Sequence, residues 1–369
     1  MKRRLQLGLV LALAGAVLLA GGCTPLHYYA QAVHGQFSLL ADARPIDDWL
    51  ADPATTARLR AKLVKAKQIR QFAAAELGLP DNQSYRSYAD LKRPYVIWNV
   101  VATPELSMEQ QRWCFPVAGC VSYRGYYGKV DAQEYASRLR RSGLDVQVAG
   151  VPAYSTLGWF NDPVLSTFIH YPDGELARLV FHELAHQVLY VQDDTQFNES
   201  FATAVEEAGV ERWLLAQGDP VLRQAYIQHE GRKQDFLNLL LRHRKALEAN
   251  YDRVASDADK RARKVAIFSE LSDDYQILKA AWGGYVGYDR WFAEPLSNAH
   301  LAAVATYHDY VPAFRALLAQ QKTFPRFYAA AARLAALDKP QRQQQLAQLG
   351  RLGMPAGQRT VPASLSPAR

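Results

Sequence analysis

Residues 182–186 read His-Glu-Leu-Ala-His, and no other feature constrains the fold of this chain so strongly. Apolar triplets lie on both sides of the motif and Asp173 is a good helix N-cap, so we predict a helix over 174–191. Histidines four residues apart project from one side of a helix, about 6 Å apart along its axis. The competing interpretation, a pair of ordinary surface histidines, does not explain the apolar flanks. A buried His-Glu-His set without a metal would also be costly.

The imidazoles of His182 and His186 can together bind one Zn²⁺, and Glu183 beside them can take a proton from metal-bound water. A catalytic zinc also needs a third protein ligand and an open position. Glu199 lies at the start of the next predicted helix, over 196–217, and an antiparallel return of the chain would bring it level with His186. We therefore predict that Glu199 is the third zinc ligand and that Glu183 is the catalytic base.

Glu206 lies seven residues after Glu199, two helical turns further along the same face. It would there be level with His182, so we predict that Glu206 orients a ligand imidazole without binding the metal itself. Two alternatives stay open. The two glutamates could exchange roles, or Glu207 could be the ligand.

The N-terminus has the pattern of a bacterial export signal. Lys2-Arg3-Arg4 is positively charged, an apolar run extends from Leu5 to Ala20, and small residues precede Cys23. The run is short for a membrane-spanning helix. We predict that residues 1–22 are a lipoprotein signal peptide and that Cys23 is lipidated, which would anchor the protein to a bilayer. Simple cleavage and an uncleaved anchor are the alternatives, because alanine stands where the lipoprotein box usually has leucine.

By resemblance to lipoprotein sorting, the residue after the cysteine indicates the destination. Thr24 replaces the aspartate that retains such proteins in the inner membrane, so we expect the protein to face the periplasm from the outer membrane. Only Cys114 and Cys120 remain, with a proline and a glycine between them. In an exported protein they are natural disulfide partners. Free thiols or a thiolate metal site are weaker alternatives, because no further cysteine pair and no histidine lies nearby in the sequence.

The order of apolar patterns predicts an α+β fold that is predominantly helical, with a small sheet on the N-terminal side. We predict one domain over 23–338 and a disordered tail over 339–369, which is rich in Gln, Pro and Ala. The net charge of +7 includes three positive residues of the signal, and no dense basic stripe is present, so nucleic acid is excluded as a partner. The predicted strands are 95–101, 144–148 and 165–170, and the further predicted helices are 26–40, 55–77, 132–141, 219–249, 257–281, 299–321 and 325–337.

The two halves of the predicted site resemble the zinc site of aminopeptidase N-type enzymes, which are gluzincins. His-Glu-Leu-Ala-His-Gln is followed here by Asn-Glu-Ser-Phe-Ala over 198–202, with a second glutamate at the matching offset. The whole chain, with its lipoprotein cysteine, Cys-Phe-Pro-Val-Ala-Gly-Cys and Tyr-Arg-Gly-Tyr, more closely resembles bacterial lipoproteins classed as putative aminopeptidases. That resemblance covers most of 23–335. It implies a zincin-like fold, a peptide substrate, zinc bound by His182, His186 and Glu199, and Glu183 as base and acid.

These features predict a zinc-dependent peptidase, and the resemblance makes it an aminopeptidase that hydrolyses peptide bonds with zinc-activated water. The Gly-x-Met-Glu-Asn segment that holds the substrate amine in aminopeptidase N-type enzymes is absent, so a zinc endopeptidase is an alternative. Asp162 could hold the amine, but an Asn-Asp-Pro turn explains it as well. A non-enzymatic envelope lipoprotein that uses the scaffold for binding is a further alternative. For the oxyanion donor we prefer the loop 283–288, with Tyr307-His308 second; packing is the competing role for both.

Overall fold

The computed structural model describes residues 24–115, 119–154, 156–304 and 310–353. Its helices are α2 (Thr24–Ala41), α3 (Ile46–Ala51), α4 (Ala57–Leu77), α5 (Lys129–Arg141), α6 (Asp173–Val188), α7 (Thr195–Gln217), α8 (Pro220–Asp252), α9 (Asp257–Ala281), η1 (Asp289–Phe292), α10 (Asn298–Ala302), α11 (Val311–Gln321), α12 (Phe324–Ala335) and α13 (Lys339–Gly353). Its strands are β1 (Arg44–Pro45), β2 (Ser87–Ala89), β3 (Ile97–Pro104), β4 (Trp113–Phe115), β5 (Gly119–Val121), β6 (Arg124–Tyr126), β7 (Leu144–Val151) and β8 (Val164–Leu165). The fold is therefore α+β and mostly helical, as the sequence predicted.

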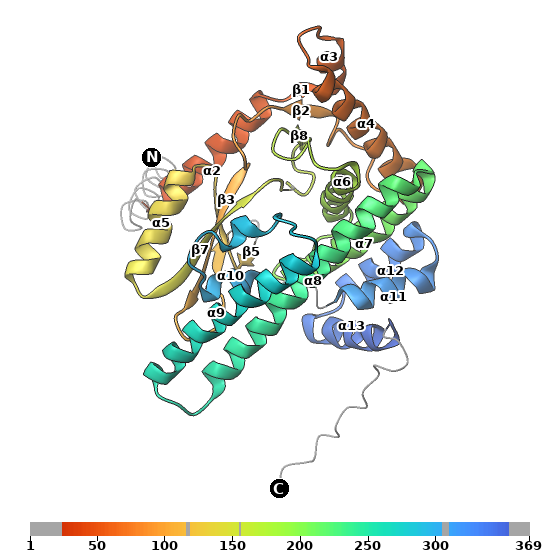
Figure 1. The fold of residues 1–369 in the computed structure, drawn as a ribbon. Coiled ribbons are helices and arrows are strands. Elements are labelled where there is room, and N and C mark those ends of the chain that lie inside the picture. The colour runs from red at the N-terminus through yellow and green to blue at the C-terminus, as the bar shows by residue number, and fades with distance from the viewer. Residues whose placement is uncertain (1–23, 116–118, 155, 305–309, 354–369) are drawn as a thin grey trace, which may run out of the picture.

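One small antiparallel sheet has α5 packed on one face and the helical body on the other side (Figure 1). Its strand order is β6-β3-β7, and β3 pairs with β7 along its whole length, from Ile97 opposite Val151 to Pro104 opposite Leu144. Successive side chains of a strand point to opposite faces. Trp98 and Val100 therefore pack in a cluster with residues of α5, while the alternate residues of β3 face the helical body.

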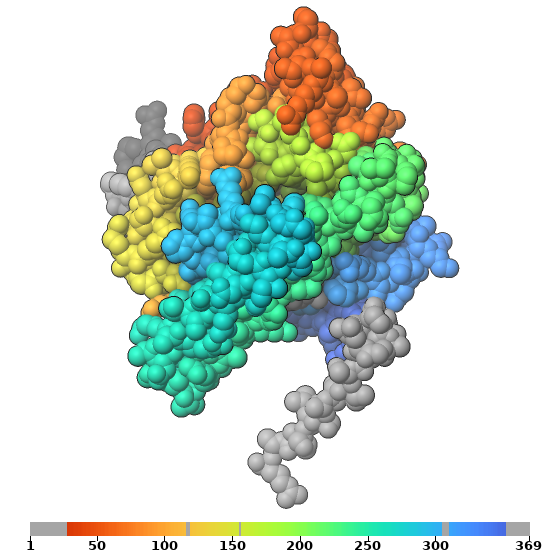
Figure 2. Space-filling model, in the orientation of Figure 1, coloured from red at the N-terminus to blue at the C-terminus, as the bar shows by residue number. Residues whose placement is uncertain are grey.

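The α6–α7 pair forms the centre of the largest hydrophobic core. The two helices are joined by a short loop, so they pack as antiparallel neighbours. Helices α4, α11 and α12 complete this core, in which the largest fully buried side chains include Trp213, Phe181 and Phe201. The pair α8–α9 packs a second core and crosses the front of the molecule as a diagonal ridge (Figures 1 and 2). This packing fixes the position of α6 on several sides.

The segment before α6 differs from the prediction. Residues 165–170 were predicted to be a strand, but only Val164 and Leu165 belong to one, and the chain then turns until α6 begins at Asp173. Backbone bonds from the amides of Phe168 and Ile169 to the Leu165 carbonyl close the turn. The apolar run is buried in the core, and this burial explains the strand-like composition.

The C-terminal region also differs from the prediction. A disordered tail was predicted from residue 339, but α13 extends to Gly353 and packs on α11. Leu346 is fully buried, and the buried Arg342 guanidinium donates to Asp194 at 2.9 Å. Two anchor residues thus hold a segment whose composition is otherwise polar. Residues 354–369 lie outside the described residues, as do the predicted signal peptide and Cys23.

Within the described ranges, every helix is too short or too polar to span a bilayer.

Cys114 and Cys120 form the disulfide that the sequence predicted, between β4 and β5.

Candidate metal centre

Helix α6 is buried on most of its surface and carries three of the predicted site residues in its C-terminal half. Asp173 and Glu175 lie in its first turn, where carboxylates interact favourably with the helix dipole. Lys62 donates to Asp173 at 2.7 Å and holds this end of the helix. The other end stops at Val188, because Leu189 is extended. The helix is therefore a fixed support for its histidines.

The loop after α6 is held by the first residues of α7. Asp194 caps α7 by accepting from the amide of Phe197 at 3.3 Å. The buried side-chain amide of Asn198 accepts from the amide of Val191 at 2.7 Å and donates to the carbonyl of the same residue at 2.8 Å. These bonds fix the register between the two helices. As a result, Glu199 faces the histidines of α6.

The structure brings His182, His186 and Glu199 together. The two Nε2 atoms are 3.1 Å apart, and Oε2 of Glu199 lies 3.3 Å from the first and 3.8 Å from the second. Two ligands on one tetrahedral zinc, each about 2.0–2.1 Å from the metal, are about 3.3 Å apart. The three donors therefore have the mutual spacing of a shared ion, and an imidazole–imidazole–carboxylate set suits zinc.

Glu206 lies behind His182 and sets its tautomer. Its Oε2 is 2.7 Å from Nδ1 of His182, and a carboxylate can only accept, so Nδ1 carries the hydrogen. In the neutral ring, the Nε2 lone pair then points to Glu199. Burial would lower the pKa of His182, but the carboxylates of Glu206 and Glu199 raise it to about 10. The site thus favours a positive charge between these groups, which a proton or a metal ion can supply.

Arg178 holds Glu206 in turn. Its guanidinium donates to the two carboxylate oxygens of Glu206 at 3.2 and 3.3 Å and to Glu175 at 2.9 Å. Burial would raise the pKa of Glu206, but Arg178 and His182 lower it to about 2. The buried carboxylate therefore stays ionised at neutral pH. An ionised acceptor on the far side of a ligand imidazole strengthens metal binding.

His186 is in the neutral form that binds metals. Burial lowers its pKa to about 4, and its Nδ1 has no hydrogen-bond partner among the described residues. Glu183 projects from the same helix into the cavity in front of the histidines. Burial raises the pKa of Glu183 to about 7, against the influence of His182. A carboxyl group that titrates near neutral pH can both accept and return a proton.

A cavity of about 330 Å³ opens in front of the three donors. Ligand pockets typically measure about 300–1,000 Å³, so this one accommodates a short part of a substrate. Ile97 and Asn99 of β3 form one wall, on the face of the strand opposite α5, and the histidines of α6 form another. Among the described residues that line the cavity, the only carboxylates are those of Glu183 and Glu199.

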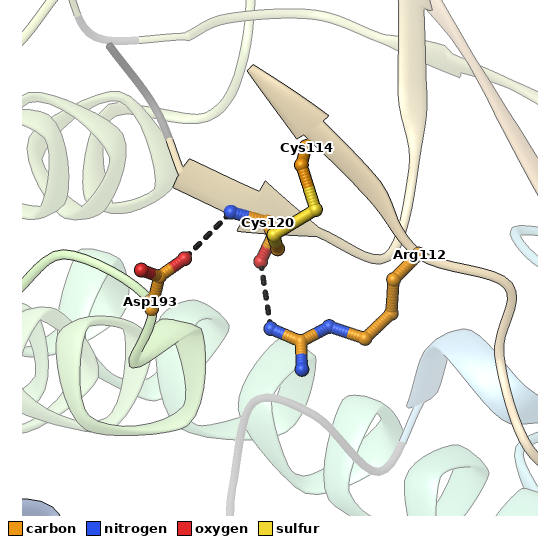
Figure 3. Close-up of a disulfide and its surroundings, with 4 residues drawn as sticks. All are labelled: Arg112, Cys114, Cys120 and Asp193. Atoms are coloured by element: carbon orange, nitrogen blue, oxygen red, sulfur yellow. Dashed lines mark hydrogen bonds between the residues drawn. A yellow bond between two sulfur atoms is a disulfide. The ribbon is translucent and has the colours of Figure 1, made fainter. Parts of the chain in front are cut away.

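The disulfide hairpin of β4 and β5 lies against the loop between α6 and α7 (Figure 3), and Val121 at its end lines the cavity. The amide of Cys120 donates to Asp193 at 2.6 Å, which ties the hairpin to the loop between α6 and α7. Gly119 has a φ of +71°, and a Cβ there would clash with the Asp193 carboxylate, so only glycine fits. Tyr123 follows the hairpin and lines the cavity. Burial and the nearby Glu199 carboxylate raise the pKa of Tyr123, so its hydroxyl keeps its proton.

A protein-family model described as putative aminopeptidase matches residues 27–346. The chain belongs to this family. No curated protein and no solved structure matches it. The family name agrees with the peptidase activity expected from the sequence, and the match covers every residue of the metal centre described above.

The sequence offered two sources for the oxyanion donor and one candidate to hold the substrate amine at this aminopeptidase-family site. No residue of the loop 283–288 lines the cavity. Its aromatic rings pack on α8 instead: Tyr288 stacks on Phe236 with 4.0 Å between ring centroids, and Arg232 lies over Tyr285. Tyr307-His308 lies outside the described residues. The Asp162 carboxylate is buried and accepts from the amide of Thr156 at 3.0 Å, as in the turn interpretation.

The sequence reasoning missed Tyr123, Arg178 and Asn99 as residues of the site or its support. Tyr123 lies three residues after a disulfide cysteine, and nothing local indicates that the hairpin meets α6. Arg178, however, precedes His182 by one helical turn, so its position on the same face could have been recognised.

Proposed function

We propose that this protein is a zinc-dependent peptidase of the aminopeptidase type. The observation that carries the proposal is the convergence of His182, His186 and Glu199 at the spacing of zinc ligands, with Glu183 in the adjoining cavity. A zinc ion held by these residues would polarise a peptide carbonyl and lower the pKa of a bound water.

The side chains of the cavity have complementary parts in this proposal. Glu183, whose pKa is about 7, accepts a proton at its carboxylate and can return it to the leaving amine. Tyr123 lines the cavity and keeps its phenolic proton, so we assign it as the donor to the substrate carbonyl oxygen as charge develops there. Glu206 holds the ring of His182, and Asn198 holds the helix start that carries Glu199.

The aminopeptidase assignment is drawn from the family name, and a zinc endopeptidase is the second candidate. One observation favours the second candidate. Beyond Glu183 and Glu199, the described lining residues offer no carboxylate to hold a free amine. Hydrolysis of free and N-acetylated forms of the same peptides by the purified protein decides between them. An aminopeptidase should cleave only the free forms, while an endopeptidase should accept both.

Glu183→Gln tests the catalytic assignment. Glutamine keeps the shape but cannot accept a proton, so peptidase activity should fall by at least about a hundredfold. Zinc content at this site should stay near one ion, because Glu183 is not one of the three residues whose ligand atoms converge there. Glu199→Ala should lose zinc and activity together. Chelator should abolish wild-type activity and added zinc restore it. If zinc-loaded wild type cleaves no peptide, the non-enzymatic binding protein becomes the better interpretation.

We also propose, from the sequence, that Cys23 is lipidated and anchors the protein to the periplasmic face of the outer membrane. Residue 24 begins α2, so such an anchor would hold the domain close to the bilayer. From the resemblance, we also propose that the domain has a zincin-like fold.

A further inference from the structure

A second group of possible metal ligands lies between α6 and α8. It consists of Glu175, His229 and Glu230, whose ligand atoms all lie within 4.8 Å of one another. None of the three lines the cavity that contains Glu183. Glu175 is buried, whereas the side chains of His229 and Glu230 are 35% and 28% exposed, so an ion could enter from solvent.

One carboxylate oxygen of this group has no hydrogen-bond partner. Oε2 of Glu175 accepts from Arg178, but Oε1 accepts no hydrogen bond from any described residue, although the side chain is only 9% exposed. That oxygen faces Nε2 of His229 at 3.5 Å. This separation is long for a charge-assisted hydrogen bond but close to the roughly 3.3 Å between two ligands of one tetrahedral ion. A buried carboxylate oxygen that accepts no hydrogen bond is costly, and a cation shared with His229 would satisfy it better than this long ion pair does.

The backbone of α6 is shaped to admit α8 at this point. A Cβ on Gly174 would lie 2.6 Å from Cδ2 of Tyr226, so a larger residue would displace the Tyr226 ring from α6. Tyr226 lies one turn before His229 on α8, and the close approach therefore brings His229 and Glu230 to Glu175. Lys233 donates to both oxygens of Glu230, at 3.3 and 3.4 Å, so Glu230 would exchange this ion pair for the cation.

We propose that Glu175, His229 and Glu230 bind a second divalent cation, of the zinc class, that joins α6 to α8. One imidazole and two carboxylates suit such an ion. Glu175 and His182 are seven residues apart on α6, about 10 Å along the helix. Ions that share a reaction lie about 3.5–4 Å apart, so this site is structural and not part of a two-metal catalytic centre.

The second site is connected to the first through Arg178. Its guanidinium contacts both Glu175 and Glu206, and Glu206 holds His182. An ion at Glu175 would fix the carboxylate that positions Arg178. The second ion should therefore stabilise the whole arrangement behind the catalytic histidine, and its loss should loosen α8 from α6. The inference does not depend on peptidase activity.

The test is metal stoichiometry of the full chain after chelation, reloading with Zn²⁺ and removal of excess ion. Wild type should retain two zinc ions per chain, and His229→Ala and Glu230→Gln one each. His182→Ala should also retain one, at the second site. His170→Ala, on an exposed histidine before α6, is the matched control and should retain two. In the His182→Ala background, zinc should still raise the melting temperature, and adding His229→Ala should remove that shift.

The outcomes separate this site from the catalytic one. A wild-type protein with one zinc, lost in His182→Ala and unchanged in His229→Ala, overturns the second site and leaves the proposed function intact. Two ions that persist in both His229→Ala and Glu230→Gln also overturn it, because the second ion then lies elsewhere. Two ions in His182→Ala would contradict the catalytic site instead. Glu230→Gln is nearly isosteric and partly exposed, so the test does not depend on how well the histidine variant folds.

Discussion

Replacing Glu206 by glutamine tests how the imidazole of His182, a proposed zinc ligand, is oriented. Glutamine keeps an oxygen that can accept from Nδ1 of His182, so the geometry should survive while the negative charge is lost. Loss of such a partner typically lowers metal affinity about 10–100-fold, which is about 1.4–2.8 kcal/mol. Arg178 also loses one of its two carboxylates. A fully broken buried pair costs about 3–5 kcal/mol, but Glu175 remains, so we expect roughly 2 kcal/mol less stability.

Zinc affinity is measured by competition with a chromophoric chelator, and stability by denaturant unfolding of the metal-free protein. The matched control is Glu207→Gln. Glu207 is the next residue of α7 and pairs with Arg315 at 2.6 Å on a more exposed surface. The control should bind zinc within about twofold of wild type, since exposed ion pairs contribute little. Equal affinity of the two variants would refute the orienting role. Complete metal loss in Glu206→Gln, with retention in Glu199→Ala, would show that the two glutamates have the opposite roles.

Four further predictions follow from single features. Burial raises the pKa of Asp162 to about 6, above its value in the unfolded chain. The folded protein therefore binds this proton more tightly, which stabilises it fully below about pH 4, and this stabilisation is lost as the pH rises through 6. Asp162→Asn should therefore gain stability relative to wild type between pH 4 and 7, by up to about 3 kcal/mol, and a pH-independent difference would contradict this. Tyr123→Phe should lower kcat about 10²–10³-fold with zinc content unchanged, and an unchanged kcat would exclude it as the oxyanion donor. Replacing Cys114 and Cys120 by serine should reduce activity at temperatures where the protein stays folded, whereas parallel loss of activity and fold would indicate a purely stabilising disulfide. Labelled fatty acid should enter wild type but not Cys23→Ser, and a mature chain with an unmodified cysteine would exclude lipidation.

The helix pair at the site could be predicted because its signals are local. Histidines four residues apart must share a helix face, and the loop before Glu199 is short enough to force an antiparallel return. The structure has α6 and α7 within a few residues of the predicted ranges, and Glu206 contacts His182 as expected. Glu199 was expected level with His186, but its carboxylate lies 3.3 Å from His182 and 3.8 Å from His186. The assignment of ligand and base among these residues stays a prediction that the proposed variants test.

The cavity could not be predicted, because its other walls are distant in sequence. Ile97 and Asn99 reach the site only through the pairing of β3 with β7, and Tyr123 only through the bond between Cys120 and Asp193. The glycine- and tyrosine-rich loop near residue 285 illustrates the opposite error. Its composition suggested a mobile element near the substrate, but its aromatic rings pack on one another and on α8. Composition does not distinguish these two uses of tyrosine.

The buried network behind the metal centre nevertheless has a sequence pattern. Glu175, Arg178, His182 and His186 follow one another at intervals of three and four residues, so they form one polar stripe down an otherwise apolar helix. Two carboxylates buried on the same side would repel each other, and Arg178 lies between Glu175 and Glu206 as the cation that lets both stay ionised. On an apolar helix that carries two candidate zinc ligands, a charged residue one turn before the first histidine therefore indicates a buried carboxylate that orients this histidine. The stripe begins at Glu175, whose second oxygen accepts no hydrogen bond from a described residue and faces His229, the group for which we propose a second cation.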